Sequence, residues 1–149
     1  MSLPSTVSRT VEQTQHWLAA LRDALALEDE GQAWSVLRGV LHHLRDRMPP
    51  DEAADLGAQL PTLVRGLYYE GWRPAATPEK DRDRDAFMVR VAERMGGQPD
   101  LDFENACRAV FALLDAALDS GEIDDVILTQ PSDVRDLWPD AARARAEAE

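Results

Sequence analysis

The residues between Arg65 and Trp72 have the types that most readily form a binding surface. Arg65, Tyr68, Tyr69, Glu70 and Trp72 bring three aromatic rings and two opposite charges into one short segment. Tyr, Trp and Arg are enriched among the residues that dominate protein–protein binding energies. The same rings could instead fasten a connector onto helices, with Arg65 in a structural ion pair, because aromatic side chains mostly serve packing. The segment therefore has two interpretations, a binding surface and a structural clamp.

Histidine and aspartate residues offer two candidate metal sites. The three histidines are His16, His42 and His43. Adjacent residues of a helix point about 100° apart, so His42 and His43 do not readily bind the same metal ion. No Glu-x-x-His pair of the kind found in di-iron bundles is present. We therefore expect no histidine metal site.

The alternating residues Asp81, Asp83 and Asp85 are typical of the start of a calcium-binding loop. Such a loop needs glycine at its sixth position and glutamate at its twelfth, where this chain has Ala86 and Ala92. A solvated helix start with local charge pairs fits better. We expect neither a metal nor a cofactor.

No catalytic nucleophile can be named from the sequence. The single cysteine, Cys107, shares an apolar helical stripe with Val110, Phe111 and Leu114, which indicates a buried thiol. The chain contains no nucleophile motif, glycine-rich phosphate loop or paired cysteines. The sequence gives no basis for predicting an enzyme.

The elements that position these residues repeat along the chain. A shift of 70 positions aligns the segment 37–67 with 107–137 without a gap and gives nine identical pairs, where roughly two are expected by chance. The identical positions are Arg38, Val40, Leu44, Glu52, Asp55, Pro61, Val64, Arg65 and Leu67 with their counterparts. The whole of 1–149 is thus expected to form one domain of two repeats, about 5–74 and 75–144, followed by a short C-terminal tail.

Each repeat has the pattern of four helices. Apolar residues at helical spacing predict a first helix ending near Leu25 and a second between Leu37 and Met48. Proline is favoured at helix starts, so Pro49-Pro50 and Pro61 predict where the third and fourth helices begin. Residues 71–78 form a connector, and 141–149 a short exposed helix or a frayed tail. The predicted fold is an all-α bundle of about eight helices, in which an approximate twofold relates two four-helix repeats packed through their second helices.

Several polar residues occur in both repeats. Glu52 and Glu122 are explained by the preference of helix N-termini for negative charge. Asp55 and Arg65 lie on successive helices, close enough to pair across the turn, and Asp125 and Arg135 would pair in the same way. Features that recur in this manner favour a structural role.

The charge balance limits the partners. The net charge is −12, of which −3 falls in residues 1–74 and −9 in 75–149, and such a field repels nucleic acid and anionic lipid. No apolar run approaches the about 20 residues of a membrane span, and there is no basic, apolar N-terminal signal segment. We expect a cytoplasmic protein with no nucleic-acid or membrane partner; nothing indicates an oligomeric state.

Several motifs resemble one prokaryotic family. They are the run from Leu37 to Arg47, the tripeptide Gln59-Leu60-Pro61, the segment Arg65–Trp72 and the sequence Thr77-Pro78-Glu79-Lys80. Together they make the chain similar, from about Thr14 to Pro139, to the family called "domain of unknown function 2267". The resemblance implies a soluble helical bacterial protein and no catalytic residues.

Two classes of function follow from these features. The absence of catalytic motifs, the acidic surface and the aromatic segment favour a non-enzymatic interaction or adaptor protein with a protein partner. The alternative is a small-molecule binding protein with a pocket between the repeats, near Tyr68, Tyr69 and Trp72.

Overall fold

The computed structural model describes residues 2–80, 83–96 and 100–148, and in this part the chain is all-helical, as predicted. Nine α-helices and one 3₁₀ turn are present there, and no strand. The helices are α1 (Ser5–Leu25), α2 (Glu30–Arg47), α3 (Pro50–Gln59), α4 (Thr62–Tyr69), α5 (Arg84–Arg94), α6 (Phe103–Ala117), α7 (Ser120–Leu128), α8 (Ser132–Arg135) and α9 (Asp140–Glu147), and the 3₁₀ turn η1 is Pro74–Ala76. No helix among these residues is long and apolar enough to cross a bilayer.

Aspartate and proline mark the helix starts. The carboxylate of Asp29 accepts a hydrogen bond from the Gln32 amide and so caps α2, and Asp83, Asp102 and Asp119 cap α5, α6 and α7 in the same way. The other five helices begin directly after a proline. The predicted starts at Pro49-Pro50 and Pro61 are confirmed. Asp83 is thus a helix cap, while Asp81 lies outside the described residues.

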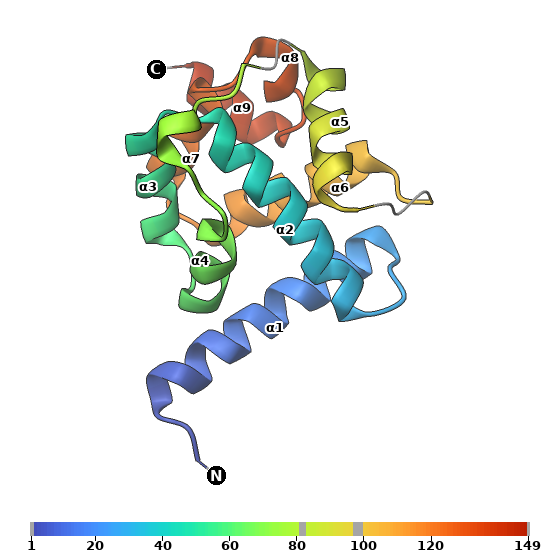
Figure 1. The fold of residues 1–149 in the computed structure, drawn as a ribbon, viewed down its shortest axis with the longest axis vertical. Coiled ribbons are helices and arrows are strands. Elements are labelled where there is room, and N and C mark those ends of the chain that lie inside the picture. The colour runs from blue at the N-terminus through green and yellow to red at the C-terminus, as the bar shows by residue number, and fades with distance from the viewer. Residues whose placement is uncertain (1, 81–82, 97–99, 149) are drawn as a thin grey trace.

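Helix α2 lies at the centre of the molecule (Figure 1). It packs against α1, α4, α5 and α6, and every residue from Leu41 to Met48 is buried. This burial includes the polar side of the helix, with His42, His43 and Arg45. The amphipathic pattern predicted only the apolar stripe. The polar side is buried because α4, α5 and residues 70–80, which include the connector, lie over it.

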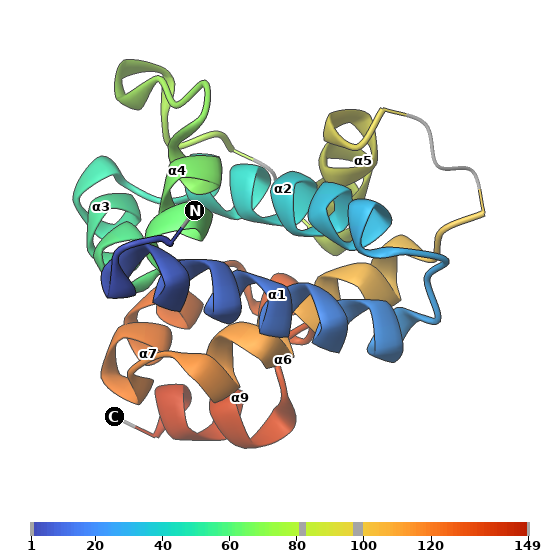
Figure 2. The same ribbon diagram turned by 90° about the horizontal axis from the view of Figure 1, so that it is seen from below.

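Most of the other helices, with α2, form two groups on either side of α1. Figure 2 shows α1 running between a group containing α2, α3, α4 and α5 and a group containing α6, α7 and α9. Helix α3 packs against α7, α1 packs against α6 as well as α2, and α5 packs against α2 as well as α6. The C-terminal segment is a helix fixed against α7, with Ala142 and Ala146 buried, rather than a frayed tail.

Candidate functional site

Arg45 of α2 holds the segment that contains the predicted binding residues. Its Nη1 atom donates hydrogen bonds to the backbone carbonyls of Tyr68, at 2.7 Å, and Glu70, at 2.8 Å. The other side of the guanidinium donates to both oxygens of Asp46, at 2.8 and 3.1 Å. Nearby, a ring nitrogen of His42 lies 2.7 Å from the carbonyl oxygen of Leu67. The end of α4 is therefore fixed to α2 by buried polar contacts.

Tyr68 lies in the core. Its side chain is fully buried, and its hydroxyl donates a 2.7 Å hydrogen bond to the carbonyl oxygen of Ala53 in α3. Burial raises the pKa of the phenol well above its ordinary value. These contacts give Tyr68 a structural role that joins α4 to α3.

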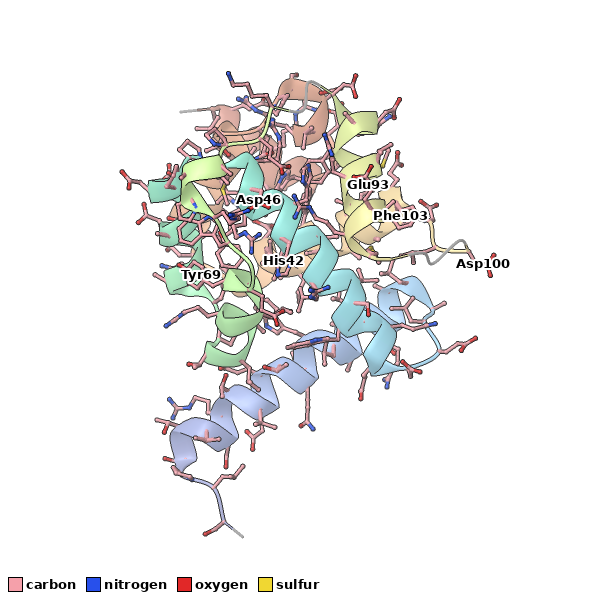
Figure 3. All side chains as sticks on the ribbon, in the orientation of Figure 1. His42, Asp46, Tyr69, Glu93, Asp100 and Phe103 are labelled. Carbon is pink, nitrogen blue, oxygen red and sulfur yellow. The ribbon has the colours of Figure 1, made fainter. Side chains whose placement is uncertain are left out.

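Tyr69 and Trp72 are only partly buried and lie on each other. Their ring centroids are 5.2 Å apart in a stacked arrangement, and the Tyr69 hydroxyl reaches the Ala54 carbonyl at 3.4 Å. A β-carbon on Gly57 would lie 2.2 Å from that hydroxyl, so the glycine lets the ring approach α3. In Figure 3, Tyr69 and Glu93 of α5 lie on opposite sides of the view. The two rings thus form a rigid aromatic surface at the edge of α3 and α4.

Glu70 is on the surface beside these rings. Its carboxylate pairs with Arg38 of α2 at 3.3 Å, and their side chains are 56% and 48% exposed. An ion pair this exposed contributes little to stability, about 0–1 kcal/mol. Both groups therefore remain available to another molecule.

Arg65 does not pair with Asp55, which corrects the sequence expectation. Its guanidinium instead donates to the carbonyls of Gly57, Ala58 and Leu60, at 2.9–3.1 Å, at the end of α3. The carbonyls of a final helical turn lack partners within the helix, so a cation there is favourable. Arg135 makes the matching contacts with the carbonyls at the end of α7.

Three carboxylates meet where α3 packs against α7, a grouping that the sequence interpretation missed. Glu52, Asp55 and Glu122 each place an oxygen within 4.8 Å of the others. One oxygen of Glu52 and one of Glu122 are buried without a hydrogen-bond partner among the described residues. Neither α3 nor α7 contains a Lys, Arg or His. The sequence did show that a glutamate recurs at the same place on two helices without basic residues. That the two glutamates lie close together follows only from the packing of α3 on α7.

The carboxylate cluster of Glu52, Asp55 and Glu122 retains protons unusually well. Burial, followed by the negative charges of Glu52 and Asp55, raises the pKa of Glu122 to about 7. Burial, with the charges of Asp125 and Asp55, also raises the pKa of Glu52. At neutral pH the cluster can therefore hold a proton, and its oxygens are of the kind that Ca²⁺ and Mg²⁺ prefer.

His42, His43 and Cys107 are buried and serve packing, whereas His16 does not. His43 is fully buried. Its ring packs edge-on with Phe87, with the ring centroids 4.7 Å apart, and its Nδ1 atom lies 3.4 Å from a Glu79 oxygen. Burial lowers the pKa of His42, and His16 is exposed on α1. Burial raises the pKa of the Cys107 thiol to about 12, so it is a poor nucleophile.

Two of the cavities on the surface of the described residues could take a ligand. One of about 630 Å³ lies between the end of α1 and the start of α6, lined in part by Leu25, Glu28 and Asn105. The other, of about 220 Å³, lies between α2, the connector and α5, and its lining includes both neighbours of Trp72, Gly71 and Arg73. Only the second adjoins the predicted binding segment.

Comparison with known proteins gives a family and no activity. No curated protein matches the chain. The family model described as "Uncharacterized conserved protein (DUF2267)" matches residues 14–137, which is most of the sequence and includes the segment Arg65–Trp72. The chain therefore belongs to the DUF2267 family of uncharacterized conserved proteins.

Proposed function

We propose that this is a non-enzymatic interaction protein that binds a basic segment of a partner protein. The contact surface consists of Tyr69, Glu70, Trp72 and Arg38, and the observation that carries the proposal is the half-buried Tyr69–Trp72 stack. Two large rings at the surface, already ordered by packing, can bind without losing much side-chain freedom. Of the five residues predicted from the sequence, Arg65 and Tyr68 support this surface from within.

The charges around the rings support a basic partner. Lysine and arginine side chains favour the faces of Trp and Tyr, and Glu70 offers a carboxylate beside the stack. The Tyr69 hydroxyl contacts Ala54, the residue before Asp55 of the carboxylate cluster. The net charge of −12 also attracts cationic partners over a distance.

The test is affinity capture from native lysate with a matched pair of double variants. Tyr69→Ala with Trp72→Ala removes the stack, whereas Leu63→Ala with Val89→Ala removes two exposed apolar side chains elsewhere. We expect proteins with basic segments to be retained by wild type and the control, lost by the stack variant, and released as salt rises from about 0.05 M to about 0.5 M. Equal retention of every protein by the stack variant and wild type would refute the proposal.

We also infer that residues 1–149 form one domain of two related repeats, about 5–74 and 75–144. Helices α2 and α6 end 70 positions apart, at Arg47 and Ala117, and α3 and α7 begin 70 positions apart. Arg65 and Arg135 make matching contacts. Helix α1 packs on α6 while its counterpart α5 packs on α2, which supports an approximate twofold.

The second candidate function is a small-molecule binding protein with a pocket between the two repeats. One observation favours it. The 220 Å³ cavity lies between α2 of the first repeat and α5 of the second, beside the connector that joins them.

A further inference from the structure

The cavity between α2, the connector and α5 is lined mainly by charged side chains. Arg45, Arg73 and Arg94 contribute three guanidinium groups, and Asp46 and Glu79 contribute two carboxylates. The lining is thus net positive in a protein whose total charge is −12. A local reversal of charge of this kind favours an anionic ligand.

Contacts within the protein already occupy both carboxylates. Asp46 accepts hydrogen bonds from Arg45 on both oxygens, and its Oδ2 atom lies 3.0 Å from Arg94. Glu79 receives Arg94 Nη2 at 3.2 Å on each oxygen and has His43 at 3.4 Å. The negative charge in the cavity is therefore neutralised by groups that hold the walls together.

Two of the guanidinium groups retain unused donors. All contacts that Arg94 makes with described carboxylates use its Nη2 atom, which leaves the N–H groups of Nε and Nη1. The side chain of Arg73 is exposed and forms no ion pair with the described residues. Arg45 uses four of its five N–H groups, two on Asp46 and two on backbone carbonyls. Arg73 and Arg94 thus offer several N–H groups to an acceptor with more than one oxygen.

The walls of the cavity are fixed before any ligand arrives. The Glu79 amide donates to the Asp46 carbonyl at 2.7 Å, and Arg47 donates to the Glu79 carbonyl. On the opposite side, Arg45 holds the carbonyls of Tyr68 and Glu70. Fixed walls lose little freedom on binding, whereas the exposed Arg73 side chain becomes ordered when the ligand binds. The volume of about 220 Å³ is below the about 300–1,000 Å³ of typical small-molecule pockets, so the ligand must be compact.

We propose that this cavity binds a phosphate group, held by Arg73 and Arg94. Guanidinium groups match the oxygens of phosphate with paired, charge-assisted hydrogen bonds. The group can come from inorganic phosphate or from a small phosphomonoester, which share this chemistry. The proposal rests on the second candidate function, small-molecule binding, and names phosphate as the class of ligand. The site is separate from the protein-binding surface, because Tyr69 and Trp72 do not line the cavity.

Isothermal titration tests the site with sodium phosphate and with glycerol phosphate as probes, against sodium chloride at equal ionic strength. The proteins are wild type, Arg73→Gln and the control Arg90→Gln, which neutralises an exposed arginine of α5 paired with Glu93. We expect saturable phosphate binding by wild type and by the control, and affinity about tenfold weaker for Arg73→Gln, the loss of about one charged hydrogen bond. Because Arg73 is exposed, its variant should unfold at the wild-type temperature in chloride.

The two phosphate probes distinguish the sources. Tighter binding of glycerol phosphate identifies a phosphomonoester, and tighter binding of inorganic phosphate identifies the free ion; either result supports the site. Heats that match those of chloride, or equal phosphate affinities for Arg73→Gln and Arg90→Gln, would overturn it. Such a failure leaves the protein-capture result unchanged, so the two proposals fail separately.

Discussion

Arg45 shows how a charged residue can be buried as part of a scaffold. Only 2% of it is exposed, yet its guanidinium has an acceptor on every side: the Asp46 carboxylate and the carbonyls of Tyr68 and Glu70. A buried ion pair of this kind contributes to fixing one geometry more than to net stability, but removing one partner is strongly destabilising. The geometry that it fixes is the end of α4, which carries the aromatic surface.

We therefore expect Arg45→Ala to lower the free energy of unfolding by about 3–5 kcal/mol, because it leaves two carbonyls without their donor and the buried Asp46 carboxylate with Arg94 as its remaining partner. Arg38→Ala, on the same helix and also facing Glu70, should change it by less than about 1 kcal/mol, since that pair is exposed. Urea unfolding followed by circular dichroism measures both. Similar losses for the two variants would show that Arg45 does not hold the segment.

At the scale of helices, local signals predict some starts well, although α2 begins at Glu30, before its predicted stretch. Pro49 and Pro61 act through their own backbones, so the starts of α3 and α4 could be predicted from the sequence alone. The role of Arg65 could not, because its acceptors are carbonyls freed by the end of α3. The meeting of Glu52 with Glu122 depends on the packing of helices 70 residues apart, which no local pattern specifies.

The carboxylates at the α3–α7 contact should make the protein less stable as pH rises toward neutrality. The pKa of Glu122 is about 7 in the folded chain and has an ordinary value of 4.5. Between these values the folded state binds more protons than the unfolded state, so the contribution of this group to stability falls as pH rises through that window. Glu122→Gln removes the titrating group and should be more stable than wild type at pH above 7, by about 1–2 kcal/mol after allowance for solvent screening.

The measurement is the difference in unfolding free energy between Glu122→Gln and wild type, determined from about pH 4 to about pH 8. It should grow with pH across this range. Glu93→Gln, which removes an exposed carboxylate of α5 paired with Arg90, serves as the control and should give a nearly constant difference. A constant difference for Glu122→Gln as well would mean that the carboxylates do not interact in solution.

For the whole molecule, the main structural fact is that helices of the N-terminal part pack on helices of the C-terminal part. Helix α1 covers α6 as well as α2, and α5 covers α2 as well as α6. Neither half can therefore bury its own apolar stripe without the other. The repeat in the sequence indicated two similar units, but the spacing of apolar residues carries no information about which unit each helix would cover.

This arrangement predicts that the chain unfolds in one step, even if it contains the two related repeats proposed above. The amides of α2 and α6 that are most protected from hydrogen exchange should share one free energy of opening, because each helix loses part of its cover when the other half unfolds. Val40→Ala in α2 leaves a cavity in the core and should lower the value for both helices equally, by about 1–3 kcal/mol. Native-state exchange measured by nuclear magnetic resonance tests this. If the mutation lowered protection in α2 alone and left α6 unchanged, the two halves would be separate folding units, and the mutual covering of α2 and α6 would not govern stability.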